Sequence, residues 1–273
     1  MKKIHYILFT ILVMTFSGCE QVIDVDLETA APRLVIDASI QWQKGTNGET
    51  QKVKLTTTAP YFGTEIPTVS NATVFITDSN NTIFNFIETP DTGEYYCTDF
   101  VPVLNTSYVL TVITNGETYT ATETFKPVPV IDKVEQIVKE GFSGEYTQIK
   151  AFYTDDAATN DFYLFRWKPN FKAIPSYSIS EDEFYQGNQI FGLYISEDFK
   201  PGDKIDITIY GISERYYNYM NKLISIVETG GPFQSPPSKV LGNIVNTTNK
   251  DNYALGYFNL SEIDFLNYEV VEE

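Results

Sequence analysis

Short runs of alternating apolar and polar residues dominate the chain between residues 33 and 125. The runs are rich in β-branched and aromatic residues, and Gly, Pro, Asn or Asp bounds each of them. Alternation with a period of two places every second side chain on one face of a strand, which is typical of an antiparallel sandwich. We expect strands at residues 33–40, 52–56, 73–77, 82–86, 95–97, 107–113 and 118–122.

Two of the intervening segments predict tight hairpin turns. Residues 78–81 read Asp-Ser-Asn-Asn, and residues 114–117 read Thr-Asn-Gly-Glu. Asn and Gly tolerate the positive φ that tight reversals of the chain require. Short strands joined by such turns predict an immunoglobulin-like β-sandwich over residues 33–126.

A change of pattern follows at residues 126–130, which read Lys-Pro-Val-Pro-Val. Two prolines favour an extended, semi-rigid segment that neither a helix nor a central strand absorbs, so we expect a domain boundary here. Residues 131–273 predict a second antiparallel β domain, because their runs alternate in the same way. Its strands are expected at residues 131–138, 147–153, 162–168, 190–195, 204–210 and 253–258, after which the tail becomes acidic.

One segment of the second domain has a helical period instead. Between residues 213 and 228, apolar residues recur at intervals of three and four. The stripe consists of Tyr216, Tyr219, Met220, Leu223, Ile224 and Val227. Ser213 is suited to cap the start of the helix, and the Gly-Gly-Pro sequence at residues 230–232 ends it. We expect this helix to cover an open face or end of the second sheet.

The N-terminus has a basic start, an apolar run and a small-residue stretch, in that order. Two lysines precede an apolar run over residues 6–16, and a Ser-Gly pair leads into Cys19. The run is too short to cross ~30 Å of hydrocarbon but suits an export signal, so residues 1–18 predict a cleavable signal peptide. Small residues that lead directly into a cysteine resemble the lipobox of bacterial lipoproteins, which implies acylation of Cys19. The alternative is an incidental cysteine beside an ordinary cleavage site.

An acidic leader, residues 19–32, follows the cleavage site, with acids at Glu20, Asp24, Asp26 and Glu28. Acidic residues just after the cysteine resemble the signal for surface display in lipoproteins of the Bacteroidetes type. The resemblance implies a lipid-anchored location in the cell outer membrane that faces the exterior.

The charge balance bears on partners. The chain has 36 acidic and 19 basic residues, a net charge of −17. Nucleic acid is therefore excluded as a partner, because its binding depends on Lys and Arg that displace condensed counterions. Two explanations stay open: solubility of an exported domain, or binding of cationic ligands or basic protein surfaces.

Histidine and cysteine usage limits the chemistry. The single histidine, His5, falls in the predicted signal peptide, which excludes Ser-His-Asp and Cys-His catalysis and imidazole-bound zinc in the processed chain. Cys97 has no partner for an intramolecular disulfide once Cys19 carries lipid. Alternation places Cys97 on the same strand face as Tyr95, as expected of a buried, inert thiol.

Two acidic clusters are candidates for calcium binding, since their oxygens are the ligands that calcium prefers. The first contains Asp155, Asp156 and Asp161, with Asn160 between them, and the second is the Glu-Asp-Glu sequence at residues 181–183. Neither matches an EF-hand loop, and solvated acidic turns are the alternative. No zinc-type, phosphate-loop or dinucleotide motif occurs, so we expect no cofactor. A glycosidase pair of carboxylates cannot be singled out among so many acids.

Residues 170–189 mix aromatic and acidic residues over a stretch that is long for a connection. Phe171, Tyr177, Phe184 and Tyr185 flank its loop-like residues. Aromatic side chains supply rigid contacts to sugars, peptides and proteins, so these four are candidate ligand-binding residues. The alternative is a loop packed over the core.

Several segments together resemble a known family, the Bacteroidetes outer-membrane lipoproteins catalogued as domain of unknown function 4249. The segments are residues 34–38, 71–78, 93–96, 212–219, 231–233, 236–237, 242–244 and 254–258. The resemblance covers nearly the whole processed chain. Asn71 stands where many relatives carry Gly, which changes a turn rather than a role. The resemblance implies that the protein accompanies a TonB-dependent receptor, and it implies no set of catalytic residues.

These observations favour a surface-exposed, non-enzymatic lipoprotein that captures a ligand for a TonB-dependent receptor or stabilises the receptor. Two alternatives remain open. One is a carboxylate-dependent hydrolase of surface polysaccharide, and the other is a purely structural envelope protein.

Overall fold

The computed structural model describes residues 31–46, 50–60, 65–142, 144–228 and 239–272. The fold described below is that of Pro32–Glu273, the second of the two units into which contacts divide the chain. The predicted signal peptide, Cys19, nearly all of the acidic leader and the predicted helix stop at residues 230–232 lie outside the described residues. No helix within the described ranges is long and apolar enough to cross a membrane.

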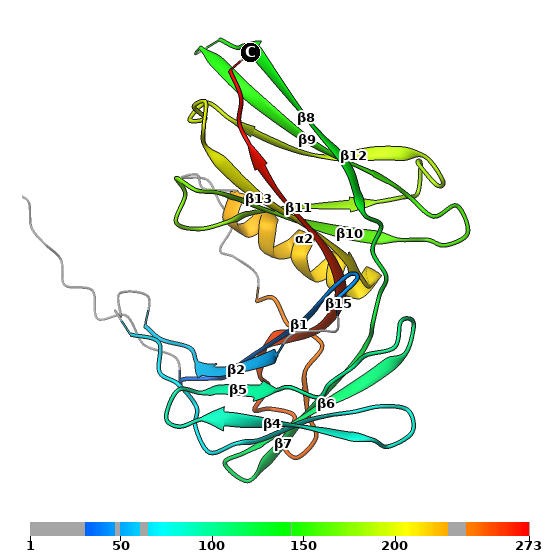
Figure 1. Ribbon diagram of the computed structural model, residues 1–273. Coiled ribbons are helices and arrows are strands. Elements are labelled where there is room, and N and C mark those ends of the chain that lie inside the picture. The colour runs from blue at the N-terminus through cyan, green and yellow to red at the C-terminus, as the bar shows by residue number, and fades with distance from the viewer. Residues whose placement is uncertain (1–30, 47–49, 61–64, 143, 229–238, 273) are drawn as a thin grey trace, which may run out of the picture. The chain divides into compact units, whose positions relative to one another are not determined.

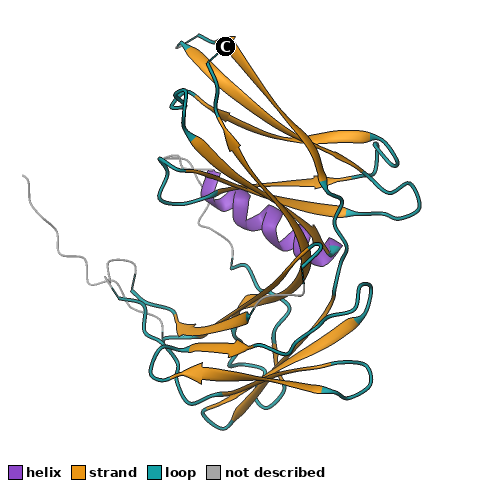
Figure 2. Ribbon diagram, in the orientation of Figure 1, coloured by secondary structure: helices purple, strands orange, loops and turns teal. Residues whose placement is uncertain are grey.

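The described part of the second unit is mainly β, which confirms the predicted fold class (Figures 1 and 2). Its strands are β1 (Leu34–Gln43), β2 (Gln51–Thr57), β3 (Thr73–Thr77), β4 (Ile83–Thr89), β5 (Glu94–Cys97), β6 (Ser107–Thr114), β7 (Glu117–Thr124), β8 (Ile131–Glu140), β9 (Glu145–Thr154), β10 (Phe162–Pro169), β11 (Ser176–Glu181), β12 (Gln189–Ser196), β13 (Lys204–Ile212), β14 (Val245–Asn246) and β15 (Leu255–Glu269). One helix, α2 (Glu214–Glu228), joins them.

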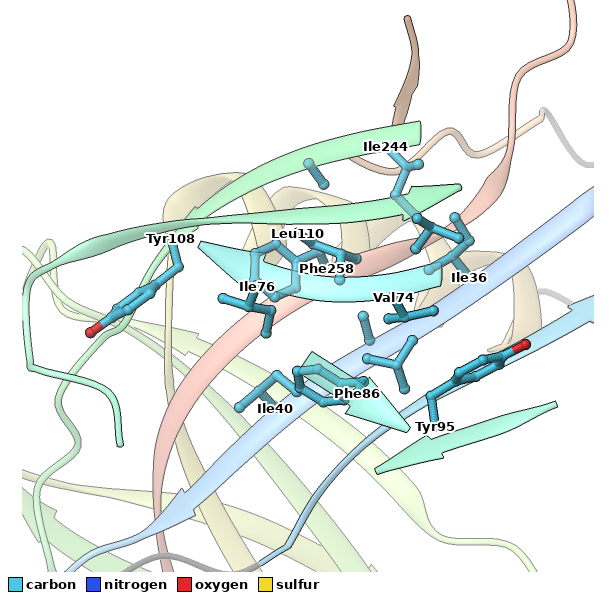
Figure 3. Close-up of a cluster of buried hydrophobic side chains, with 14 of the residues drawn as sticks. Ile36, Ile40, Val74, Ile76, Phe86, Tyr95, Tyr108, Leu110, Ile244 and Phe258 are labelled. Carbon is cyan, nitrogen blue, oxygen red and sulfur yellow. The ribbon is translucent and has the colours of Figure 1, made fainter. Parts of the chain in front are cut away.

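The first core lies between two layers of a sandwich. Strands β1, β2 and β5 form one layer, and β3, β6, β7 and β14 form the other. Strand β4 belongs to both, because its first half pairs with β3 and its last residues pair with β5. Alternate residues point inward, so that Ile36, Ile76 and Leu110 are almost fully buried (Figure 3). The expected hairpin turns occur at Asn81 and Asn115, both with positive φ.

The second core lies between strands β11, β10, β13 and β15 and a three-stranded sheet of order β12, β9, β8. Aromatic side chains fill it. The rings of Phe165 and Trp167 stack at 5.3 Å, and the rings of Trp167 and Tyr194 stack at 5.8 Å. These large inward residues supply most of the burial, since each aromatic removes a large apolar area from water.

Strand β15 takes part in both cores. Its first half pairs in parallel with β1, and its second half pairs antiparallel with β13 (Figure 1). Phe258 and Leu260 lie in the first core, whereas Leu266 and Tyr268 pack against the second. The expected strand at 253–258 therefore continues to Glu269 and includes the segment read as an acidic tail. The two-domain division stays a prediction, but the C-terminal segment does not pack with residues 131–212 alone.

The proline-containing segment 126–130 is held along β15 by two acidic side chains. The Val128 amide donates to Glu262 at 3.0 Å, and the Ile131 amide donates to Asp264 at 2.7 Å. Lys44 pairs with Glu262 at 2.8 Å and also donates to the Val128 carbonyl oxygen. The boundary segment is thus fixed at several points rather than left as a free spacer.

The helix α2 confirms the predicted amphipathic segment. The Ser213 hydroxyl accepts a hydrogen bond from the Tyr216 amide at 3.2 Å, which is the expected N-cap. The apolar stripe packs against Leu164 and Tyr210 on the face of the large sheet opposite the second core, except for Val227, which is 82% exposed. Figure 2 shows this single helix lying against the strands. The helix therefore covers part of one sheet face and leaves the rest open.

Candidate functional site

A groove on the uncovered part of this sheet face is the best candidate site. It has a volume of about 560 Å³ and crosses β1, β15, β13, β10 and β11. We call it the sheet groove; it is lined by Gln41, Gln43, Arg166, Tyr177, Thr208, Tyr210, Ile263 and Phe265. The alternation of these strands places the residues on one face, opposite to the side chains that fill the cores.

Strand register aligns four of the lining residues. Tyr177 lies opposite Arg166, Arg166 lies opposite Thr208, and Thr208 lies opposite Phe265. Directly opposite residues in antiparallel strands have Cβ atoms about 4.5–5.5 Å apart, so these side chains form one row across four strands. Tyr210 lies two residues along β13 from Thr208, on the same face and beside the helix-covered patch.

Arg166 is the one cation of the sheet groove and is half-buried. Among the described residues its guanidinium group forms no ion pair and no hydrogen bond. The positive charge of Arg166 does affect the pKa of Tyr210. The pKa of Tyr210 is raised to about 12, mainly by burial and also by Tyr177, while Arg166 acts in the opposite direction. The Tyr210 hydroxyl group therefore stays protonated at neutral pH and is available as a donor.

A second groove continues the first along β1 and β2. It has a volume of about 390 Å³ and shares Gln41, Gln43 and Ile263 with the sheet groove. Its remaining walls are mostly polar: Asp37, Ser39, Thr50, Gln51, Lys52 and Lys54. Both lysines contact the carboxylate of Glu94, at 3.2 and 3.6 Å, which balances one of their two charges. The two grooves together give an elongated, polar surface with aromatic residues at one end.

The structure separates the four aromatic residues that the sequence singled out. Only Tyr177 lines the sheet groove, and it does so because residues 176–181 form β11 and pair with β10. Phe171 packs on Phe199, with ring centroids 5.3 Å apart. Phe184 and Tyr185 are exposed in the turn after β11. The expectation of one recognition loop over 170–189 is therefore wrong, since an alternating Ser-Tyr-Ser-Ile-Ser run favours a strand.

A cluster of three carboxylates joins the two acidic segments of the sequence. Oxygen atoms of Asp155, Asp161 and Asp182 all lie within 4.8 Å of one another. Asp156 stays outside the cluster, and its carboxylate accepts from the Ala158 amide in a local turn. The sequence thus pointed to Asp155 and Asp161 correctly as neighbours, but it placed Asp182 in a separate group.

Most oxygens of this carboxylate cluster already have partners. Asp155 accepts from the Tyr163 hydroxyl at 2.7 Å and from the Gly187 amide at 3.1 Å. Asp182 accepts from the Asp161 amide at 2.9 Å. Calcium takes roughly six to eight oxygen ligands, and most of the six oxygens of these three carboxylates already accept hydrogen bonds. Calcium binding at these residues stays a prediction. The bonds that are present tie the turns 155–161 and 182–188 together.

The pKa of Asp161 is raised. Burial is the main cause, and the charges of Asp155 and Asp182 add to it, while the Thr159 hydroxyl acts in the opposite direction. A carboxyl group with a raised pKa beside other carboxylates is a feature of acid catalysis, but it also arises in buried turns of this kind.

Cys97 behaves as the sequence predicts. Its side chain is buried in the first core beside Tyr95, and burial raises the pKa of the thiol to about 11. A thiol in that state is a poor nucleophile at neutral pH.

The comparisons with known proteins concern family and fold. The model of the family described as "Domain of unknown function (DUF4249)" matches residues 20–264. No curated protein matches. Asn71 has a φ of 62°, a conformation that favours Gly or Asn, which explains why either residue suits this turn.

Solved structures with a related arrangement include two chicken proteins. One is a two-domain fibronectin type III segment of tenascin, with 11% identity, a TM-score of 0.22 and coverage of 66% of this chain and 90% of that chain. The other is a three-domain fibronectin segment of CNTN1, with 15% identity, a TM-score of 0.25 and coverage of 67% and 63%. A DUF4785 family protein from Legionella pneumophila has 10% identity, a TM-score of 0.26 and coverage of 67% and 54%. At these TM-scores none of the three bears on function. The family match spans most of the chain, and the protein therefore belongs to the family described as domain of unknown function DUF4249.

Proposed function

We propose that this protein is a non-enzymatic, lipid-anchored outer-membrane protein that captures a ligand at the cell surface beside a TonB-dependent receptor. The observation that carries the proposal is the sheet groove, which offers hydrogen-bond donors, amides and aromatic rings on a fixed sheet face. Sites of a few hundred Å³ with a small number of placed polar groups are typical of ligand binding.

The scaffold under the groove supports capture rather than adaptation. Strand β15 pairs on both sides, and the segment 126–130 is held to it by Glu262 and Asp264. A site held in this way loses little conformational entropy when a ligand binds, which favours affinity.

The chemistry available supports a role without catalysis. His5 is the sole histidine in the sequence and lies in the predicted signal peptide. The Cys97 thiol is buried, and the sheet groove has no acidic residue among the described residues that line it. Acid–base and nucleophilic catalysis therefore lack their usual groups at this site.

The carboxylate cluster favours the second candidate, a hydrolase of surface polysaccharide. Glycosidases that retain configuration place two carboxyl groups about 5–5.5 Å apart, one of them with a raised pKa. Asp161 has the raised pKa, and its carboxylate lies within 4.8 Å of those of Asp155 and Asp182. Against it, both oxygens of Asp155 are engaged by Tyr163 and Gly187. Loss of polysaccharide hydrolysis in an Asp161→Asn variant would support the enzyme, and no hydrolysis by the native chain would exclude it.

The test of the proposed function is affinity purification of the tagged chain from its native outer membrane, followed by mass spectrometry. We expect a TonB-dependent barrel in near-equal amount. A Cys19→Ala variant, which cannot carry lipid, is the matched control and should be absent from the outer-membrane fraction. Recovery of the lipidated chain without any barrel, under several nutrient conditions, would contradict the accessory role and favour a purely structural protein.

A further inference from the structure

Among the described arginines, Arg166 is the one that forms neither an ion pair nor a hydrogen bond, whereas Arg33 and Arg215 have both been given partners by the fold. The chain has 36 acidic residues against 19 basic ones, so acids are plentiful. Other cations of the fold use them: Lys44 pairs with Glu262, and Arg215 pairs with Glu123. A half-buried guanidinium group without a carboxylate has lost part of its hydration with nothing in return. A ligand that supplies the missing anion would make up for that loss.

The groups around Arg166 are also donors. Tyr177 lies opposite it on one neighbouring strand and Thr208 on the other, and both carry hydroxyl groups. Tyr210 adds a third hydroxyl, and the amides of Gln41 and Gln43 line the same groove. The lining contains no carboxylate among its described residues. The sheet groove is thus a locally positive, donor-rich site on an acidic molecule, which selects for an anion.

Among the described residues that line the sheet groove, Arg166 supplies the single positive charge, and a singly charged anion matches it. Lys52 and Lys54 in the adjoining groove share the single carboxylate of Glu94, and Lys168, two residues along β10 from Arg166, donates to the Lys172 carbonyl oxygen. A dianionic phosphate would keep one uncompensated charge in the field of a molecule with a net charge of −17. A carboxylate carries one charge, and its two oxygens match the parallel N–H groups of the guanidinium fork.

The walls indicate what carries that carboxylate. Strands β10, β13, β15 and β1 each have neighbours on both sides, so the groove floor offers no free strand edge to a peptide backbone. The accessible groups are hydroxyl and amide side chains, with the rings of Tyr177 and Phe265 about two-fifths exposed at the rim. Side-chain donors beside aromatic faces suit a polyhydroxylated ring better than an extended peptide.

We propose that the sheet groove binds an acidic sugar, with Arg166 holding the carboxylate of a uronic acid unit and the adjoining groove along β1 and β2 receiving neighbouring units of the chain. The inference rests on the proposed capture function and names the ligand class at the same site. Tyr177 and Thr208 donate hydrogen bonds to the same sugar.

The experiment measures binding of the full processed chain to short oligosaccharides of galacturonic acid by isothermal titration calorimetry. Oligosaccharides of galactose, sulfated galactose and an acidic peptide are the comparison probes. We expect binding of the uronic acid oligosaccharide alone. Charged hydrogen bonds contribute about 1.5–3 kcal/mol, so Arg166→Gln should weaken binding on the order of 10- to 100-fold. Arg166→Lys keeps the charge without the fork and should recover only part of the affinity.

Lys204→Gln is the matched control, because it removes one positive charge from the same sheet but from an exposed pair with Glu269. It should leave affinity unchanged. Unaltered thermal unfolding of the Arg166 variants will show that they fold. Equal binding of neutral and acidic sugars, preference for the sulfate or the peptide, no binding of any sugar, or full affinity in Arg166→Gln would each overturn the inference. Recovery of a TonB-dependent barrel with the native chain tests the proposed function independently, so the two can fail separately.

Discussion

Removal of the Glu262 carboxylate tests whether the segment 126–130 is held by β15. In Glu262→Ala, the Val128 amide loses its hydrogen-bond acceptor, and water does not readily replace it because Val128 is only 3% exposed. A buried N–H without a partner costs about 1–3 kcal/mol. The ion pair with Lys44 is lost as well, but the Lys44 side chain is 35% exposed, so that loss adds only about 0–1 kcal/mol. We expect the free energy of unfolding to fall by about 1–4 kcal/mol.

The assay is urea unfolding of the purified chain, with two further variants for comparison. Glu262→Gln keeps an acceptor for Val128 and should cost no more than about 1 kcal/mol. Glu269→Ala removes an exposed acid on the same strand, paired with Lys204 at 3.6 Å, and should stay within about 0.5 kcal/mol of wild type. Hydrogen exchange adds a local readout: the Val128 amide should exchange faster in Glu262→Ala, while the Ile131 amide, bonded to Asp264, keeps its protection. Equal stability of Glu262→Ala and Glu269→Ala, or unchanged exchange at Val128, would refute the reasoning.

Three further changes test other parts of the structure. Phe258→Ala removes a ring that is 0% exposed in the first core and should cost about 3–5 kcal/mol in urea unfolding, so a cost below about 2 kcal/mol would contradict the core assignment. Ser213→Ala removes the N-cap of α2 and should cost about 1 kcal/mol by the same assay. Asp161→Asn should raise the melting temperature at pH 7, because the raised pKa of Asp161 means that its ionisation destabilises the folded state. The stability that this group contributes is present below its unfolded-state pKa and is lost as the pH rises through its higher folded-state pKa. Melting curves should therefore converge as pH falls towards the unfolded-state pKa, and a gap that widens there would show that the sign is wrong.

The local part of the fold could be predicted because its signals lie within a few residues. Alternation places Tyr95 and Cys97 inward and leaves Tyr96 partly exposed on the other face. Asn115 and Gly116 provide the positive φ of a hairpin turn, and Ser213 provides the cap of the only predicted helix. Each of these signals depends only on residues that are close together in the sequence, such as an alternating pattern or a turn-forming pair.

Long-range pairing could not be predicted in the same way. Strand β15 was expected to end at 258, but it continues to Glu269 because one end pairs with β1 and the other with β13. Leu255 of β15 pairs with Val35, more than 200 residues earlier in the chain, and Glu269 pairs with Lys204, about 60 residues earlier. Nothing in the sequence of β15 specifies these two partners. A hydrophobic pattern can indicate that a strand lies in the middle of a sheet, but it does not identify the neighbouring strands.

The sheet groove escaped prediction for the same reason. Arg166, Thr208 and Phe265 come from three strands and meet only through their register. Each alone is an ordinary outward residue of an alternating strand, so no local motif points to it. Tyr177 was identified because of its acidic and aromatic surroundings, although the loop that was expected there is a strand. The sequence offers one weak signal, an arginine at an outward position of a predicted strand in an acidic chain, whereas its lack of a partner is visible only in the structure.

The side chains on the two faces of β15 contribute to different parts of the structure: one face to the hydrophobic cores and the other to the sheet groove. Its even-numbered residues, such as Phe258 and Leu266, contribute to the cores on one face of the strand. Its odd-numbered residues Ile263 and Phe265 line the sheet groove on the other face. Because side chains alternate with a period of two, a substitution at Phe265 changes the groove wall without opening a cavity in either core. The shape and polarity of the groove can therefore vary on an unchanged scaffold, while the strand that carries it stays fixed between two cores.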